Sequence, residues 1–138
     1  MKLNGLLFLL ILFALISCTK DKEGRIPEVY VNYQITLQEF NISNHNNVLL
    51  VNTEGVAGII IYRRADNAYV AYDRCSSVNP ENRCAVIIDD ISLTATDPCS
   101  GAKFSLNDGS PEKAPAKRPL KEYQVKISNN FKIAISNN

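Results

Sequence analysis

The folded part of the chain is predicted to be an all-β domain, an antiparallel sandwich or small barrel. From Val29 onward the sequence consists of short runs rich in β-branched and aromatic residues, separated by clusters of glycine, asparagine, aspartate and proline. No stretch of ten or more residues there has the periodicity of an amphipathic helix. The runs expected to form strands are VYVNYQITL, NNVLLVNT, GIIIYRR, AYVAYDR, AVIIDD, SLTATD, YQVKIS and FKIAIS.

The connections between these runs contain recognisable turn signals. RADNA lies between GIIIYRR and AYVAYDR, and SNN lies between YQVKIS and FKIAIS, so both are predicted to be hairpin turns. In YQVKIS the apolar residues occupy every second position, which is typical of a strand with one buried face. Three prolines crowd SPEKAPAKRP, and this segment is expected to be an extended loop rather than a strand or helix.

Residues 1–17 are predicted to be an export signal. Lys2 precedes an apolar run from Gly5 to Ile16, which is too short to span a bilayer. The run ends in Leu-Ile-Ser-Cys, which resembles the lipobox of bacterial lipoproteins and implies that Cys18 becomes the lipidated N-terminus. An ordinary signal peptide with Cys18 as a free thiol is the alternative. Residues 18–28 would then form the lipidated N-terminus and a linker, and residues 29–138 the β domain.

Charge and anchoring limit the possible partners. The chain has 15 basic and 14 acidic residues, and removal of Lys2 with the signal leaves equal numbers, so no strong field for nucleic acid or for an anionic membrane is expected, and attachment must come from the lipid. The polar linker resembles the charged export signals of surface lipoproteins of the Bacteroidetes, with a solvated tether as the alternative. We therefore expect a protein of the cell envelope, held at the outer membrane by its lipid, facing the periplasm or the outside, with an unknown envelope protein as partner.

A hairpin that ends in YVAYDRC is followed by a loop, a second loop DPCSGAKFSLNDGSPEKAPAKRPL and a closing hairpin YQVKISNNFKIAI. This order of parts resembles a Rieske domain, most specifically in its second half. Members of that family carry Cys-Pro-x-His-Gly-x-x-Phe, a turn with glycine, and then Pro-Ala-x-x-Pro-Leu-x-x-Tyr-x-Val. The resemblance covers Gly58 to Ile135 and implies a Rieske-like β-sandwich with two cluster-type loops and a proline-rich loop. The matching positions in this chain, in an ungapped alignment, are Pro98, Gly101, Phe104, Gly109, Pro115, Ala116, Pro119, Leu120, Tyr123 and Val125.

The same resemblance implies that the cluster ligands are degenerate. A Rieske [2Fe-2S] centre needs two thiolates and two imidazoles, supplied as Cys-x-His and Cys-x-x-His. Here the four positions hold Cys75, Ser77, Asp97 and Ser100. A serine hydroxyl is a poor ligand for iron beside sulfide, so no cluster is expected. The one histidine of the chain, His45, lies in the Asn-rich segment NISNHNN, which is predicted to be a turn, and is expected to be an exposed loop residue.

An exported chain meets an oxidising compartment, so one disulfide and one thiol are expected among Cys75, Cys84 and Cys99. In the Rieske proteins of cytochrome bc-type complexes, a cysteine at the place of Cys99 pairs with one further along the first loop. The resemblance thus implies a Cys84–Cys99 bridge, although Cys84 lies farther from Cys75 than the family's spacing. Pairing of Cys75 with Cys99 stays open, as does a three-thiolate zinc site completed by Asp97 or water.

These observations give three hypotheses of function. The first is a lipid-anchored envelope protein, not an enzyme, whose Rieske-like domain has lost its cluster and acts as a binding or structural module. The second is an electron-transfer protein that holds a [2Fe-2S] cluster through non-standard ligands or a partner chain. The third is a thiol redox protein in which Cys75 exchanges with a labile Cys84–Cys99 bridge. The remaining charged groups, Asp89, Asp90, Asp108 and the basic run from Lys113 to Lys121, are expected to have turn, cap and solvated roles.

Overall fold

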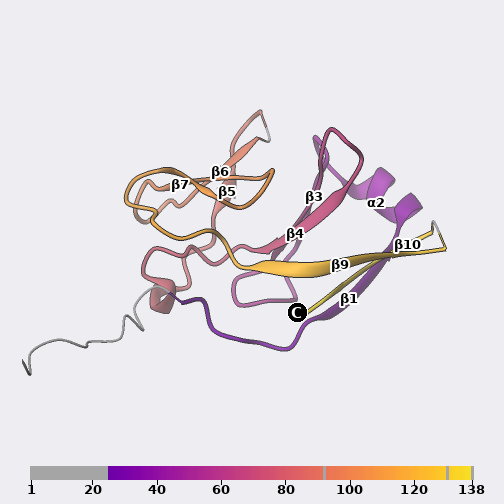
Figure 1. The fold of residues 1–138 in the computed structure, drawn as a ribbon, viewed down its shortest axis with the longest axis horizontal. Helices are drawn as coiled ribbons and strands as arrows, with labels where there is room; N and C mark the ends of the chain where they lie inside the picture. Colours follow the sequence, from indigo (N-terminus) through magenta and orange to yellow (C-terminus); the bar gives the residue numbers. More distant parts are fainter. Residues whose placement is uncertain (1–24, 92, 130, 138) are drawn as a thin grey trace, which may run out of the picture.

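Two antiparallel sheets make up the domain (Figure 1). The computed structural model describes residues 25–91, 93–129 and 131–137, so the predicted signal segment and Cys18 lie outside the described residues. The larger sheet has the order β1-β10-β9-β4-β3-β2 and the smaller one β5-β6-β7-β8. The strands are β1 (Asn32–Thr36), β2 (Val48–Val51), β3 (Ile59–Arg63), β4 (Tyr69–Asp73), β5 (Ile87–Ile88), β6 (Thr94–Thr96), β7 (Lys103–Ser105), β8 (Pro111–Lys113), β9 (Glu122–Ser128) and β10 (Lys132–Ser136).

Strand β3 lies between two apolar cores. Ile60 and Tyr62 pack with Phe104 and Leu106 in the core between the two sheets. Ile59 and Ile61 point to the other face of β3 and pack in a second core with residues such as Phe40 and Ile133. Successive side chains of a strand point to opposite faces, so a strand buried on both faces reads as a continuous apolar run. This explains why GIIIY shows no alternation in the sequence.

The predicted hairpins are confirmed. β3 pairs with β4 across RADNA, and β9 pairs with β10 across SNN, with Ile133 opposite Ile127. The alternation in YQVKIS holds where the strand lies over the core, because Tyr123 is buried and Gln124 is exposed. Ile127 is 43% exposed because it lies near the far end of the strand.

A short helix, α2 (Leu37–Ser43), was not predicted. The sequence assigns Leu37 to a strand and Asn41–Ser43 to a turn, and both assignments are wrong. A reciprocal capping box starts the helix: the Thr36 Oγ1 accepts from the Glu39 amide at 3.0 Å, and the Glu39 Oε2 accepts from the Thr36 amide at 2.9 Å. The buried Phe40 then holds the helix on the core with an edge-to-face contact to Tyr69. No helix in the described residues is long and apolar enough to cross a membrane.

The proline-rich segment also differs from its prediction. Pro111–Lys113 forms β8 at the edge of the small sheet, paired with β7 through an irregular register. The edge position tolerates Pro111, because a proline without an N–H can lie where a strand needs no donor. Gly109 precedes this strand with φ +74°, and a Cβ there would lie 2.9 Å from the ring of Tyr72. From Ala114 onward the segment forms the loop that the sequence predicts.

Candidate functional site

The first loop of the candidate site follows β4 and folds back on itself. The Ser76 amide donates to the Cys84 carbonyl at 2.8 Å, and the Val86 amide donates to the Arg74 carbonyl at 2.7 Å. The turn of 3-10 helix at Pro80–Asn82 forms the tip of this hairpin-like loop. The loop is thus held by backbone hydrogen bonds of its own.

The second loop joins β6 to β7 in a tight turn. The Gly101 amide donates to the Asp97 carbonyl and the Asp97 amide donates to the Ala102 carbonyl, both at 2.8 Å. Gly101 has φ +76°, a conformation that glycine adopts without the steric penalty of a side chain. This turn places Cys99 at the exposed tip and Asp97 at the buried base.

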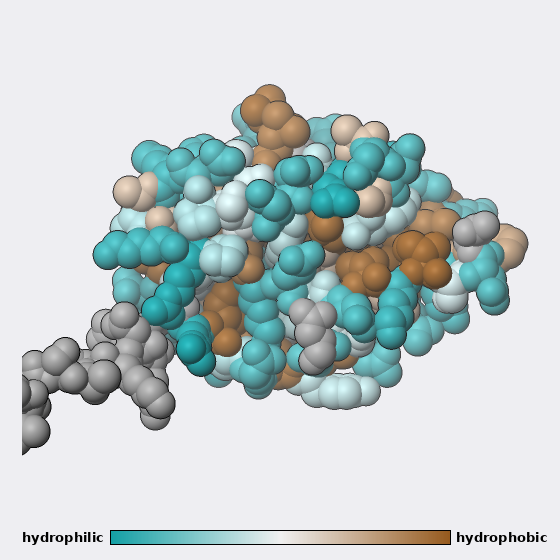
Figure 2. All heavy atoms as spheres, in the orientation of Figure 1, coloured by the Kyte–Doolittle hydropathy of each residue, from teal (hydrophilic) through white to brown (hydrophobic). Residues whose placement is uncertain are grey.

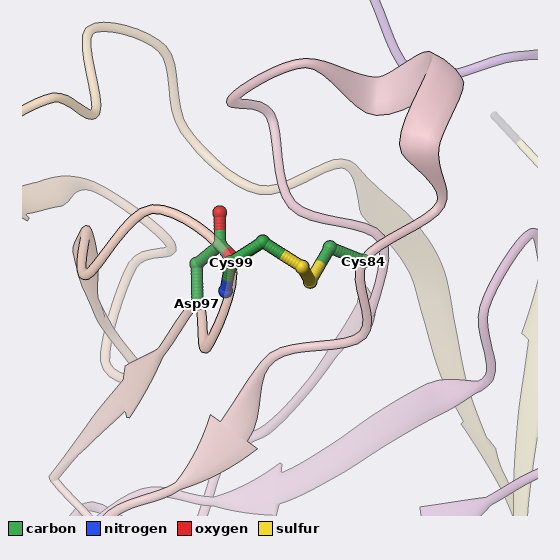
Figure 3. Close-up of side chains that lie close together, drawn as sticks. All are labelled: Cys84, Asp97 and Cys99. Carbon is green, nitrogen blue, oxygen red and sulfur yellow. Dashed lines mark hydrogen bonds between the residues drawn. A yellow bond between two sulfur atoms is a disulfide. The ribbon is translucent and has the colours of Figure 1, made fainter.

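A disulfide between Cys84 and Cys99 joins the two loops (Figure 3). The structure therefore has the pairing that the resemblance implied, and Cys75 is left as a buried free thiol. The three-thiolate zinc interpretation is wrong for this oxidised form, because two of its sulfurs are bonded to each other. The Sγ atoms of Cys84 and Cys99 and a carboxylate oxygen of Asp97 do lie within 4.8 Å of one another. The two sulfurs are bonded to each other, so of these three residues only Asp97 is left as a potential metal ligand.

Asp97 is the hydrogen-bond centre of the site. Its Oδ2 accepts from the Ser76 Oγ at 2.7 Å and from the Ser100 Oγ at 2.6 Å, while its Oδ1 accepts from the Cys99 amide at 2.8 Å. The side chain is fully buried. Burial alone would raise the pKa of this carboxyl, but the hydrogen bonds from Ser100, Ser76 and Cys99 outweigh it and the pKa is lowered. Asp97 thus stays ionised and binds both loops.

Ser77 connects the first loop to the proline-rich loop. Its Oγ donates to the Arg118 carbonyl at 2.7 Å. Ser77 is buried, and it lines a groove with Arg25, Ile26, Glu28 and residues 118–121. Three loops therefore meet at one end of the domain, which we call the loop end: residues 74–86, 97–102 and 114–121.

Cys75 lies beneath these contacts. Its Sγ lies 3.7 Å from the Ser76 carbonyl oxygen and 3.6 Å from that of Pro80. Burial, followed by the nearby charge of Asp73, raises the pKa of this thiol to about 11. A thiol that stays protonated at neutral pH is a weak nucleophile and a weak ligand.

Asp73 is a structural centre that was not predicted from the sequence. Asp73 is fully buried and accepts from the Tyr123 hydroxyl at 2.7 Å, the Cys75 amide at 2.7 Å, and the amides of Val56 and Ala57 at 2.6 and 3.2 Å. Burial, with the hydrogen bond to Asp73 next, raises the pKa of Tyr123. The available signal in the sequence was an acidic residue at the end of the apolar run YVAYD. An aspartate buried with such a strand needs hydrogen-bond donors around its carboxylate.

The lone histidine is not part of the loop end. His45 is exposed, as predicted, and lies in the turn before β2, where its backbone pairs with Val48. It lines a separate groove with Leu50 and residues 88–90. Two of the other predicted turn carboxylates are hydrogen-bonded: Asp89 accepts from Thr96 in β6 and Lys103 in β7, and Asp108 accepts from Ser110.

We predict that the double substitution Cys84→Ser with Cys99→Ser lowers the free energy of unfolding by about 3 kcal/mol, the chain-entropy value for a closed loop of this length. Urea titration measures the change. A reducing agent should shift the wild-type transition in the same direction and leave that of the double variant unchanged. A wild-type protein that is insensitive to full reduction would contradict a stabilising role of the bridge.

Asp97→Asn should lower the free energy of unfolding at neutral pH by about 2 kcal/mol, because an amide cannot accept from all three donors. Asp108→Asn, in an exposed turn where the carboxylate accepts from the Ser110 amide and hydroxyl, is the control and should lower the free energy of unfolding far less, because water can replace those hydrogen bonds. Because the pKa of Asp97 is lowered on folding, its contribution is present above about pH 4 and is lost as the pH falls through the folded pKa. The difference between wild type and Asp97→Asn should therefore shrink in acid; a constant difference would contradict the role of the charge.

Comparison with known proteins supports the fold alone. No protein-family model matches the chain, and no curated protein matches its sequence. The Rieske protein PetC3 from the plasma membrane of Synechocystis PCC 6803 is similar in structure, with a TM-score of 0.54 and 21% identity over 80% of this chain and 100% of that one. A chain from the complex of oxygenase and ferredoxin in carbazole 1,9a-dioxygenase gives a TM-score of 0.52 at 16% identity, over 78% of this chain and 94% of that one.

The ferredoxin of carbazole 1,9a-dioxygenase from Nocardioides aromaticivorans IC177 gives a TM-score of 0.50 at 16% identity, over 80% of this chain and 100% of that one. These matches span nearly the whole of each neighbour, so they concern the complete β architecture and not one hairpin. The chain has a Rieske-like fold, as its sequence predicted.

Proposed function

We propose that this protein is a lipid-anchored component of the bacterial cell envelope whose Rieske-like domain carries no [2Fe-2S] cluster and acts as a binding or structural module. The observation that supports the proposal is that the residues at the four positions of the Rieske cluster ligands are engaged in other contacts or buried. Asp97 and Ser100 are hydrogen-bonded to each other, Ser77 is bonded to the Arg118 carbonyl, and Cys75 is a buried thiol.

The residues present do not fit a Rieske cluster. Such a centre needs two thiolates and two imidazoles, and these positions offer one thiol, one carboxylate and two neutral hydroxyls. The carboxylate would have to give up three hydrogen bonds in a fully buried position to bind iron. His45 lines a different groove. No electron-transfer step through a cluster therefore follows for this chain.

The loop end has other means of holding its loops together. A disulfide, a buried carboxylate with three donors and the Ser77 contact join the same three loops. All of these contacts form between groups of this chain and need no metal. In our account they supply the cohesion that a bound cluster would otherwise give, so the fold can persist as a rigid, non-catalytic scaffold.

The envelope location rests on the sequence. The apolar run before Cys18 and the resemblance to a lipobox support export and acylation, and the disulfide is consistent with an oxidising compartment. Several acyl chains on one cysteine would anchor the domain stably, since a single chain binds only marginally. We place the anchor in the outer membrane, with the domain facing the periplasm or the outside.

The two other hypotheses have weaker support. A cluster on non-standard ligands would require Asp97 to leave its network, or a partner chain to supply imidazoles. Thiol exchange would require Cys75 to be a thiolate, and a pKa of about 11 leaves little thiolate at neutral pH. The partner of a binding module has to be found by experiment, and the exposed apolar hairpin β5–β6, with Ile87, Ile91 and Leu93, is one place to look (Figure 2).

The full-length protein, expressed in a bacterium and extracted from its membranes with detergent, should contain neither iron nor acid-labile sulfide in stoichiometric amounts. A Rieske ferredoxin of a dioxygenase, produced under the same conditions, is the positive control for cluster assembly. Colorimetric iron and sulfide assays per mole of protein measure both. About two irons and two sulfides per chain would overturn the proposal and establish the electron-transfer alternative.

A further inference from the structure

The described chain begins at the loop end. Lys121 donates its Nζ to the Pro27 carbonyl at 3.1 Å and to the Glu28 carboxylate at 2.7 Å, which ties this N-terminal segment to the proline-rich loop. Arg25 and Ile26 line a groove of about 270 Å³ with Ser77 and residues 118–121. In Figure 1 the indigo start of the described chain lies beside the small helical turn of the first loop. The point where the chain leaves the domain is therefore fixed next to Ser77.

The distance from this point to the proposed anchor is short. Six residues separate Cys18 from Arg25. Fully extended, seven steps of at most about 3.6 Å span about 25 Å. If Cys18 is acylated, which is part of the proposed function, Arg25 stays within that distance of the lipid surface. The loop end then lies closer to the membrane than the rest of the domain.

The charge of the groove suits an anionic lipid surface. Three of its lining residues are cationic, Arg25, Arg118 and Lys121, and one is anionic, Glu28, which forms an ion pair with Lys121, so the lining has a local excess of positive charge. Lys113 and Lys117 add positive charge on the exposed part of the same proline-rich segment, against Glu112. Basic residues are attracted to an anionic leaflet within about one Debye length, which is about 8 Å at physiological salt, and a tether of at most about 25 Å lets the groove come that close.

We propose that the loop end is a membrane-contacting surface, seated with the groove around Arg25 and Arg118 against anionic lipid headgroups. The surface that includes the degenerate ligand positions is thereby turned toward the bilayer. The β9–β10 turn, at the opposite end of the long axis in Figure 1, points away from it. A soluble partner would then meet the far end of the domain and not the loop end.

Tryptophan fluorescence can test this orientation, because the chain contains no tryptophan. Two full-length variants each receive one: Asn82→Trp at the exposed tip of the first loop, and Phe131→Trp in the β9–β10 turn, where the native side chain is 74% exposed. Both are reconstituted into vesicles that contain phosphatidylglycerol and a dansyl-labelled headgroup lipid. Circular dichroism of both variants checks that they fold as the wild type does.

Energy transfer to the headgroups should be at least twofold more efficient in the Asn82→Trp variant than in the Phe131→Trp variant. Transfer from position 82 should also fall when phosphatidylcholine replaces phosphatidylglycerol, because the cations lose their partner. Equal or reversed efficiencies would overturn the orientation, and identical transfer on both lipids would overturn the role of anionic headgroups.

Vesicle flotation and the mass of the N-terminal peptide distinguish this failure from failure of the proposed anchor. A protein that floats with vesicles and carries acyl groups on Cys18 but shows equal transfer contradicts the orientation alone. A protein that neither floats nor carries acyl groups contradicts the proposed function, and the inference with it. The variant Cys18→Ala, which cannot be acylated there, supplies the unanchored baseline for both tryptophan positions.

Discussion

The contact between the two loops that follow β4 and β6 is the constraint on which the loop end depends. Neither loop belongs to a sheet over most of its length, and each carries polar groups into a buried place. The Cys84–Cys99 disulfide and the Asp97 carboxylate stabilise the contact between these loops in two different ways. The covalent bond limits the unfolded chain, and the carboxylate compensates buried donors that would otherwise be unpaired.

The rest of the domain supplies a rigid base for this contact. β3 and β4 belong to the larger sheet and are buried on both faces, so this one pair of strands contributes side chains to both apolar cores. Asp73, at the end of β4, fixes the start of the first loop to β9 through Tyr123 and to the turn at Val56 and Ala57. The Cys75 amide also donates to Asp73, so the strand that precedes the first loop sets the position of Cys75.

Local patterns predicted the strands and both hairpins, because alternation and turn residues act over a few neighbours. These patterns did not predict α2, which starts at the Thr36–Glu39 capping box. They also did not predict β8, because an edge strand can contain a proline such as Pro111. The roles of Asp73 and Ser76 depend on groups 16 to 50 residues away and could not be predicted from spacing. The Cys84–Cys99 pairing came from family resemblance and not from the residues themselves.

The mass of the intact protein under native conditions, repeated after denaturation, tests the central claim most directly. The acylated chain is taken from an oxidising compartment, and its expected mass is calculated with its lipid. We predict the mass of the apo chain less two hydrogens in both states, which means one disulfide and no bound metal. An additional mass of two irons and two sulfides, present in the native state and lost on denaturation, would contradict the account.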